Sequence, residues 1–352
     1  MTSIAKPPVK HPSARTNGLG LTLRDYEGAM STLCAGCGHD SVTAALVLAA
    51  WELDLPPHMA AKMSGIGCSS KTTAYFLKQS HGFNSVHGRM PSVTSGAAVA
   101  NRSLIAIGVS GDGDSLSIGL GQLSHAIRRN VNMLYVLENN GVYGLTKGQF
   151  SASADIGSKS KKGEANAQSP IDPVLLALTL GATFVARSFS GDKQQLVPIL
   201  KAGIMHRGFA LVDVISPCVT FNDHEGSTKS YAYTRQHEVE AVSADFVPLR
   251  REITVPETDE AVRVVQLHDG ASVRLRATSS DYDPTNRASA YSHVRDCQAR
   301  GELATGLLFV EEGGHPELCD GLRLPATPLI DLPYERLCPG KSALDSLMEE
   351  FR

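Results

Sequence analysis

The sequence predicts an α/β protein built on a doubly wound parallel sheet. Apolar runs of strand length occur at residues 104–109, 133–137 and 209–215, and each run ends in residues that favour turns. Segments with apolar residues at helical spacing lie between these runs. Strands that alternate with helices in this way form a parallel sheet with right-handed crossovers. Such sheets bind ligands at the carboxyl ends of their strands.

The predicted elements follow in a regular order. The unit comprises a strand at 104–109, a helix at 115–129, a strand at 133–137, a helix at 173–180, a strand at 182–186, a helix at 193–206 and a strand at 209–215, and one more strand is predicted at 303–311. Asp172 is the expected N-cap of the helix at 173–180, because its side chain can accept from the free amides there. The Gly111 turn, the Glu138 loop and the Cys218 turn each follow a strand, so we expect them at one edge of the sheet.

Changes in composition and hydrophobic pattern along the sequence divide the chain into three parts. Residues 1–20 contain three prolines and predict a flexible N-terminal arm. Residues 21–225 contain the strand–helix unit. The stretch 231–257 is charged and broken, and we interpret residues 226–352 as a C-terminal extension.

Composition excludes several classes of protein. Hydrophobic residues make up 42% and charged residues 20% of the 352 residues, which rules out a wholly disordered, collagen-like or coiled-coil chain. The net charge of -3 gives no basic field for nucleic acid. No apolar run approaches the roughly 18 residues of a membrane span, and no apolar stretch follows the basic residues near the N-terminus as in a secretory signal. The sequence therefore predicts a cytoplasmic protein with neither a nucleic-acid nor a membrane partner.

Two polar segments follow neighbouring predicted strands and favour a cation–diphosphate site. The first is the Gly-Asp-Gly-Asp sequence at 111–114, whose glycines let backbone amides approach phosphate oxygens. The second is the Glu-Asn-Asn-Gly-Val-Tyr sequence at 138–143, which follows the next predicted strand. Asp112 offers a carboxylate to Mg²⁺, and the Asn140 side chain and the Val142 carbonyl offer neutral oxygens. The alternative is an ordinary acidic turn followed by a polar loop. The second segment, one helix and one strand later, strengthens the site hypothesis considerably.

The chain contains seven cysteines, and four of them favour a metal or redox site. These four are Cys34, Cys37, Cys68 and Cys218. Four thiolates can hold a zinc ion or a [4Fe–4S] cluster. One close pair joined by two distant cysteines in Gly- or Pro-containing turns suits a cluster better, although zinc and unligated thiols remain alternatives. We interpret the other three, Cys297, Cys319 and Cys338, as small buried hydrophobic residues.

These motifs resemble those of the β subunits of 2-oxoacid:ferredoxin oxidoreductases, most closely the 2-oxoglutarate type with separate α and β chains. The matching stretch runs from Tyr26 to about Asn222. Six segments carry the resemblance in family order: LCAGCGH at 33–39, GIGCSSK at 65–71, HGR at 87–89, GDGD at 111–114, NNGVYGLTKGQ at 139–149 and SPC at 216–218. The resemblance implies a sheet of the thiamine diphosphate-binding (PP-domain) type.

The resemblance also implies roles for individual residues. The implied [4Fe–4S] ligands are Cys34, Cys37, Cys68 and Cys218, and the implied Mg²⁺ ligands are Asp112, Asn140 and the backbone of Val142. Cofactor contacts are implied for Ile66, Gly67, Ser69, Gly111, Gly113, Asp114, Leu145 and Thr146. Lys71, His87 and Arg89 fall next to the substrate, with Lys71 near its distal carboxylate, where a cation offsets the second charge. A solvated surface lysine and a structural hydrogen bond are the alternatives for Lys71 and His87.

The function that the resemblance implies is the thiamine diphosphate-dependent oxidation of 2-oxoglutarate with CoA to succinyl-CoA and CO₂. Electrons would pass through the cluster to ferredoxin, and the reaction would be reversible. An α chain would supply the pyrimidine-side domain and the activating glutamate, in a dimer of αβ heterodimers, with residues 226–352 at the α interface. The alternatives are pyruvate or a broad 2-oxoacid specificity, a decarboxylase subunit without redox partners, and a zinc-stapled binding module.

Overall fold

The computed structural model describes residues 4–7, 11–160, 163–247, 262–266, 272–277, 282–312 and 315–351. Within these residues one ten-stranded sheet has the order β10-β11-β9-β12-β7-β8-β4-β3-β1-β2, and β5 and β6 form a separate hairpin. The strands are β1 (Ala60–Ser64), β2 (His81–Asn84), β3 (Ile105–Gly111), β4 (Met133–Asn139), β5 (Val142–Tyr143), β6 (Gln149–Phe150), β7 (Phe184–Phe189), β8 (Phe209–Ile215), β9 (Glu238–Val247), β10 (Val262–Gln266), β11 (Ser272–Ala277) and β12 (Leu303–Val310).

The six strands from β7 to β2 in this order are all parallel, which confirms the predicted doubly wound unit. The remaining strands make the sheet mixed, because β12 pairs antiparallel with β7 but parallel with β9, and β9, β11 and β10 are antiparallel to one another. The predicted extension therefore contributes strands to the main sheet. Of the broken segment predicted at 231–257, residues 231–247 form a helix and β9, and 248–257 lie outside the described residues.

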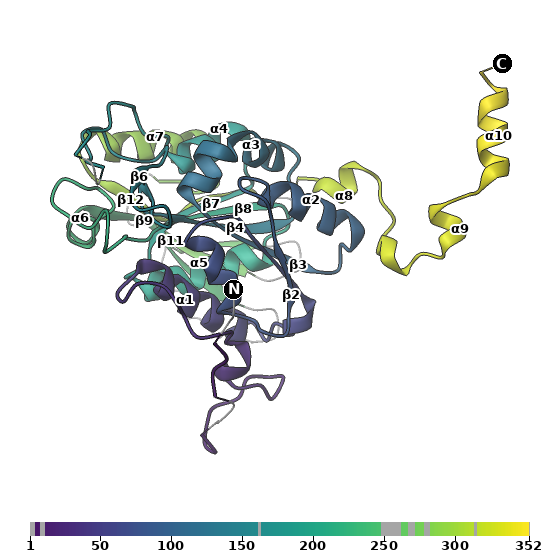
Figure 1. Cartoon of the computed structure of the whole chain (residues 1–352), viewed down its shortest axis with the longest axis horizontal. Coiled ribbons are helices and arrows are strands. Elements are labelled where there is room, and N and C mark those ends of the chain that lie inside the picture. Colours follow the sequence, from purple (N-terminus) through teal and green to yellow (C-terminus); the bar gives the residue numbers. More distant parts are fainter. Residues whose placement is uncertain are drawn as a thin grey trace.

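Helices cover both faces of the sheet (Figure 1). The helices are α1 (Gly38–Glu52), α2 (Met90–Ala100), α3 (Leu120–Arg128), α4 (Pro173–Leu180), α5 (Lys193–Met205), α6 (Tyr231–His237), α7 (Arg287–Ala299), α8 (Leu318–Gly321), α9 (Tyr334–Leu337) and α10 (Lys341–Glu349). Helices α1 and α5 pack together on one face, whereas α2, α3, α4 and α7 form a row on the other. None of the helices in the described ranges has the length and apolarity to cross a membrane.

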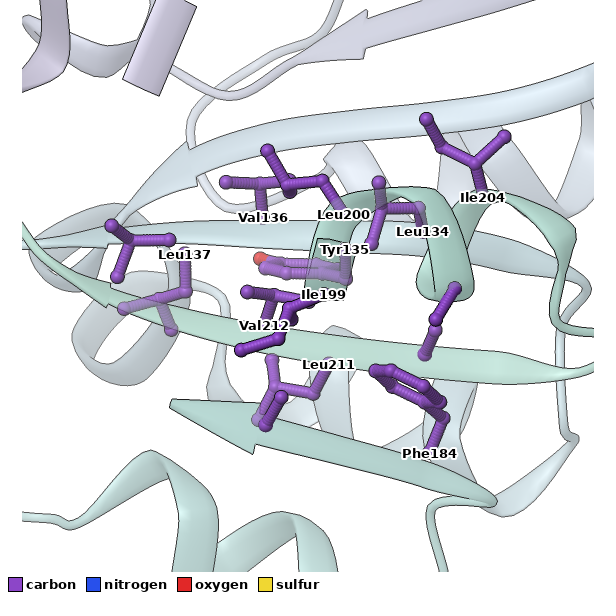
Figure 2. Close-up of a cluster of buried hydrophobic side chains, with 14 of the residues drawn as sticks. Leu134, Tyr135, Val136, Leu137, Phe184, Ile199, Leu200, Ile204, Leu211 and Val212 are labelled. Atoms are coloured by element: carbon purple, nitrogen blue, oxygen red, sulfur yellow. The ribbon is translucent and has the colours of Figure 1, made fainter. Parts of the chain in front are cut away.

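The core lies where α5 packs on the central strands. Figure 2 shows Ile199 and Leu200 of α5 against Leu134 and Val136 of β4 and Val212 of β8. All five side chains are almost completely buried. Burial of apolar side chains on both faces explains why these strands read as continuous apolar runs in the sequence.

The sequence predicted the start of α4 correctly but not the break in the helix before it. The Asp172 carboxylate accepts from the amides of Val174 and Leu175 at 2.8 and 3.0 Å, so α4 begins as predicted. The helix predicted at 115–129 is instead divided into a π-helical turn, Gly113–Ile118, and α3. The division falls at Gly119, where a Cβ would lie 2.9 Å from the Cα of Gly88. A neighbouring loop therefore passes too close for an uninterrupted helix with side chains at this point.

Residues 322–351, which we call the C-terminal arm, leave the body of the molecule beyond α8 and carry α9 and α10 (Figure 1). Several large apolar side chains on the arm are more than half exposed: Leu322, Ile330, Tyr334, Leu344, Leu347, Met348 and Phe351. The prediction that Cys338 is buried is wrong, because it lies exposed on this arm, whereas Cys297 and Cys319 are buried as predicted.

Candidate cofactor site at the carboxyl edge of the sheet

A cavity of about 110 Å³ opens at the carboxyl ends of β3 and β4. It brings together the following predicted site residues: Ile66, Gly67, Cys68, Ser69, His87, Gly111, Asp112, Gly113, Asp114, Asn140, Val142, Leu145 and Thr146. These residues come from four separate stretches of chain. The parallel pairing of Gly111 with Glu138 explains why the two polar segments meet, since both follow adjacent strands. His39, Tyr143 and Gly144 also line the cavity.

Asp112 presents a buried carboxylate to this cavity. Its Oδ2 atom accepts from the Gly141 amide at 2.9 Å, from Ser153 Oγ at 2.7 Å and from Ser151 Oγ. Burial raises the pKa of Asp112, although these hydroxyl donors oppose the shift. In the described part of the chain, Asp112 forms no ion pair with a basic side chain. A buried carboxylate without a counter-ion is a suitable ligand for a divalent cation.

The segment after β4 is fixed in place by its own hydrogen bonds. Asn140 Oδ1 accepts from the Val142 amide at 3.1 Å, and the Asn140 carbonyl accepts from Asn222 Nδ2 at 2.7 Å. Gly141 has φ of +76°, and a Cβ there would lie 2.6 Å from Asn222 Nδ2. Glycine is therefore needed for the turn that brings Asn140 and Val142 to the same cavity as Asp112.

Asp114, which the resemblance assigns to cofactor contact, binds the protein itself. Its Oδ1 atom accepts from the Gly88 amide at 2.7 Å and contacts His87 Nδ1, and its Oδ2 accepts from Ser110 Oγ at 2.6 Å. The carboxylate thus ties the loop before α2 to the end of β3. It lines the cavity while its oxygens are engaged by protein donors.

The three residues expected beside the substrate lie in different surroundings. His87 lines the cavity next to Tyr143, with ring centroids 6.2 Å apart. Arg89 is exposed at the N-cap of α2, outside the lining of the cavity. Lys71 lines a neighbouring groove of about 460 Å³ together with Lys62 and Lys78. Of the three, only His87 therefore reaches the cavity in this chain.

The four predicted cysteine ligands lie in one neighbourhood beside the cavity. A Cβ on Gly144 would lie 3.5 Å from Cys68 Sγ and 3.6 Å from Cys218 Sγ. The Gly38 amide donates to the Pro217 carbonyl at 3.2 Å, which joins the Cys-x-x-Cys turn to the turn containing Cys218. The thiols of Cys37 and Cys68 both interact electrostatically with Cys218, and Cys34 interacts with Cys68 and Cys218.

Burial affects the protonation of Cys37, Cys68 and Cys218. It raises the pKa of Cys37 to about 12 and also raises the pKa of Cys68 and Cys218. The backbone amides of Thr220 and Phe221 oppose the shift at Cys218. Bound iron or zinc would favour the thiolates instead. Among the residues that the structure describes, no three His, Cys, Asp or Glu side chains surround one ion position.

His39 and Glu138, to which the sequence motifs assigned no role, lie beside both parts of the site. His39 Nδ1 contacts Ser216 Oγ and lies 3.6 Å from Glu138 Oε2. Glu138 accepts from Thr72 Oγ1 at 3.0 and 3.1 Å. Burial lowers the pKa of His39 to about 4 and raises that of Glu138 well above its usual value. The available signals were their positions, directly after the Cys-x-x-Cys-Gly sequence and at the start of the Asn-Asn segment.

The fold and this cavity define a thiamine diphosphate-binding domain. The family model described as "Thiamine pyrophosphate enzyme, C-terminal TPP binding domain" matches residues 65–214. The chain is 41% identical over 208 residues to the 2-oxoacid:ferredoxin oxidoreductase subunit beta of Saccharolobus solfataricus, covering 59% of this chain and 68% of that protein. It is 34% identical over 189 residues to the 2-oxoglutarate synthase subunit KorB of Methanocaldococcus jannaschii, covering 53% and 69%.

A solved structure covers more of the chain. The 2-oxoglutarate:ferredoxin oxidoreductase of Magnetococcus marinus, solved with 2-oxoglutarate, coenzyme A and succinyl-CoA bound, superposes with a TM-score of 0.70 at 28% identity. The match covers 92% of this chain and 98% of that one. This chain belongs to the family of 2-oxoacid:ferredoxin oxidoreductase β subunits, which confirms the resemblance found in the six sequence segments.

Proposed function

We propose that this chain is the β subunit of a 2-oxoglutarate:ferredoxin oxidoreductase, which forms succinyl-CoA and CO₂ from 2-oxoglutarate and CoA and passes the electrons to ferredoxin. One observation carries the proposal. The cavity that contains the Asp112 carboxylate is also lined by Cys68 and Gly144, and Gly144 lies against the sulfur atoms of Cys68 and Cys218. A diphosphate site and a set of thiols therefore share one wall.

The donors around Asp112 fit Mg²⁺ and a diphosphate. Asp112, the Asn140 side chain and the Val142 carbonyl would hold the ion, and the amides of the Gly111–Gly113 turn would approach the phosphate oxygens. The cavity of about 110 Å³ is well below the roughly 300 Å³ of pockets that enclose a small organic ligand. Most of a thiamine ring system would therefore lie outside this chain.

The four thiols fit a cluster better than a single zinc ion. Tetrahedral zinc holds each sulfur about 2.3 Å away, so its ligands crowd around one point. Zinc sites usually have two close cysteine pairs, whereas these four thiols come from one close pair and two distant single cysteines. A cuboidal [4Fe–4S] cluster needs its thiolates further apart, and Cys34, Cys37, Cys68 and Cys218 would hold it. When bound, thiamine diphosphate stabilises the electron pair left by loss of CO₂, and the cluster accepts electrons singly.

Exposed apolar side chains support a partner chain over this edge of the molecule. Large side chains at or beside the cavity and the lysine groove are substantially exposed: Met30, Phe83, Val86, Ile118 and Leu145. An α chain that covered them would supply the pyrimidine-side domain and the activating glutamate. The C-terminal arm offers a second apolar surface for the same partner, and we propose a dimer of αβ heterodimers.

The lysine groove supports a dicarboxylate substrate. No Asp or Glu is found among the residues that line this groove, so Lys71 is available to the distal carboxylate. His87 lines the cavity and would transfer a proton to, or contact, the reacting oxygen atoms. Arg89 would require the partner chain to bring substrate near it, because it is exposed at the start of α2.

The test uses the copurified αβ complex. We expect 2-oxoglutarate- and CoA-dependent reduction of ferredoxin, with pyruvate a poor substrate. Lys71→Met should raise the KM for 2-oxoglutarate about tenfold or more, while Lys78→Met, in the same groove, should leave it within about twofold. Release of CO₂ without reduction of ferredoxin would favour a non-redox decarboxylase. Zinc without iron in the purified complex would contradict the cluster, and equal use of both acids would contradict the substrate assignment.

A further inference from the structure

A buried row of polar side chains runs from Asp112 to Arg187 across four adjacent strands. Asp112 follows β3, Asn139 ends β4, Asp213 lies in β8 and Arg187 lies in β7. Ser153, in the loop after β6, joins the first two. All of these side chains are at least 97% buried. Each of these side chains has a hydrogen-bond partner within the row, as is usual for buried polar groups.

The Ser151 and Ser153 hydroxyls select one oxygen of Asp112. Both donate to Oδ2, as does the Gly141 amide, and none of these three donors reaches Oδ1. The carboxylate is therefore held in one rotamer with Oδ2 engaged by protein. Because Oδ1 receives none of these three bonds, it is the oxygen that we expect to face a cation.

Ser153 is placed between two acceptors by the rest of the network. Its Oγ lies 2.7 Å from Asp112 Oδ2 and 2.9 Å from Asn139 Oδ1. The Asn139 amide is oriented by Asp213, because Asn139 Nδ2 donates to Asp213 Oδ1 at 3.0 Å. A hydroxyl has one proton, so Ser153 can donate to Asp112 or to Asn139, but not to both. It donates to Asp112 when that carboxylate is ionised, since the charged acceptor forms the stronger bond, and its contact with Asn139 Oδ1 is then a packing contact without a shared proton.

Arg187 anchors the far end of the row. Its Nε donates to Asp213 Oδ2 at 2.7 Å, and its Nη2 donates to Asp172 Oδ1 at 2.8 Å. Asp172 is itself fixed as the N-cap of α4. A guanidinium held by two carboxylates in the core cannot rotate without breaking both ion pairs. Arg187 therefore fixes the orientation of the Asp213 carboxylate, which in turn orients the Asn139 amide.

We propose that Ser153 is a positioning residue for the metal ligand Asp112, and that Asn139, Asp213 and Arg187 form the buried polar wall against which Ser153 packs. This inference rests on the proposed Mg²⁺–diphosphate site. Residues that hydrogen-bond to a metal ligand orient it and raise its affinity for the ion, and their loss typically weakens metal binding about 10–100-fold. Ser153 acts through Asp112 and does not itself contact substrate or cofactor.

The experiment measures cation binding directly. The αβ complex is stripped of divalent metal and thiamine diphosphate, and Mn²⁺ binding in the presence of added thiamine diphosphate is followed by electron paramagnetic resonance. We expect Ser153→Ala to weaken Mn²⁺ binding about tenfold or more, and Ser153→Thr, which keeps the hydroxyl, to restore most of the affinity.

Ser188→Ala is the matched control. Ser188 is a fully buried hydroxyl on β7 that donates to Gln195 Oε1 at 2.9 Å, and it points to the opposite face of the strand from Arg187. Ser188→Ala removes a buried hydroxyl oxygen and its hydrogen bond, as Ser153→Ala does. The melting temperature of the Ser188→Ala complex should therefore fall as in Ser153→Ala, while its Mn²⁺ affinity stays within about twofold. Ser151→Ala, which removes another donor to the same oxygen, should weaken Mn²⁺ binding even if Ser153→Ala folds poorly.

The outcomes separate this inference from the proposed function. If the unmodified complex binds neither Mn²⁺ nor thiamine diphosphate, the proposed cofactor site is wrong. If the unmodified complex binds both, and Ser153→Ala and Ser151→Ala bind Mn²⁺ equally well, only the positioning role is overturned. Equal weakening in Ser188→Ala would also overturn it, because the effect would then follow from lost stability.

Discussion

Gly65 lies so close to Asp114 that a Cβ atom on Gly65 would stand 2.0 Å from Asp114 Oδ2. The Gly65 amide also donates to the Val109 carbonyl at 3.1 Å, which continues the pairing of β1 with β3. Asp114 in turn holds Ser110 and the amide of Gly88. The end of β1 is therefore packed directly on the turn at residues 110–114, without space for a side chain between them.

Gly65→Ala should destabilise the protein by about 1–3 kcal/mol or more, because the added methyl group must displace a buried carboxylate. Chemical denaturation of the purified complex measures this loss. Gly121→Ala is the matched control: Gly121 is exposed in α3 and a Cβ there meets no atom within 4 Å. That change should leave stability unaltered or raise it by about 0.5–1 kcal/mol. Equal effects of the two substitutions would contradict the close contact.

Cys218→Ser should remove the iron and acid-labile sulfide from the complex and abolish reduction of ferredoxin. The reason is that one of four proposed thiolate ligands is replaced by a hydroxyl, which is a poor ligand for this cluster. Iron analysis and the visible absorption spectrum provide the measurement. Cys338→Ser, which changes an exposed thiol on the C-terminal arm, should retain full iron content. Retention of the cluster in Cys218→Ser would show that this cysteine is not a ligand.

Lys62 should make stability depend on pH in the alkaline range. Its ammonium group is buried and donates to the carbonyls of Phe76 and Leu77, and burial lowers its pKa to about 8. An unfolded lysine keeps its proton to about pH 10.4. Between these values the unfolded chain binds more protons than the folded chain, so the free energy of unfolding rises with pH. The cost of burying the Lys62 charge is fully present below pH 8 and is removed as the folded lysine loses its proton.

The stability of the parent protein relative to Lys62→Met should therefore increase by up to about 3 kcal/mol from pH 8 to 10.5. Denaturation curves recorded across this range test the prediction. Lys78→Met changes an exposed lysine of the same groove and should show no such window. If the free energy of unfolding varied with pH in the same way for the parent and Lys62→Met, the lowered pKa of Lys62 would be contradicted.

Deletion of residues 322–352 should weaken assembly with the α chain while leaving the body folded. The apolar side chains of the arm are exposed and so contribute little to the stability of the body. Copurification with a tagged α chain measures assembly, and circular dichroism monitors folding. Leu344 and Leu347 share one face of α10, and replacing both by serine should reproduce part of the defect. Unchanged copurification would remove the arm from the interface.

The sequence predicted elements well wherever the signal was local. The apolar run of β8 coincides with the observed strand, and the Asp172 cap marks the start of α4. Strand β4 extends two residues further than predicted, because Glu138 and Asn139 are buried polar residues within the strand. Their polarity indicated a loop, although their side chains are bound by Thr72, Ser153 and Asp213.

Features that depend on distant contacts were not predictable from one sequence. The break before α3 depends on Gly88, which approaches Gly119 from a separate loop. The strand pairing that places β12 between β7 and β9 joins segments far apart in the chain. Ser153 and Asp112 are 41 residues apart, and no spacing rule connects them. The motifs predicted most residues that line the cavity, but not those that hold these residues in place.

Gly144 sits with two sulfur atoms on one side and forms part of the cavity wall. A Cβ at this position would meet both sulfur atoms at ordinary van der Waals distance, so only a larger side chain would disturb both the thiols and the cavity wall. We therefore expect iron content and thiamine diphosphate affinity to fall together when Gly144 is replaced by a large residue. Substitution of Cys34 should lower only the iron content, and substitution of Asp112 should lower only the cofactor affinity.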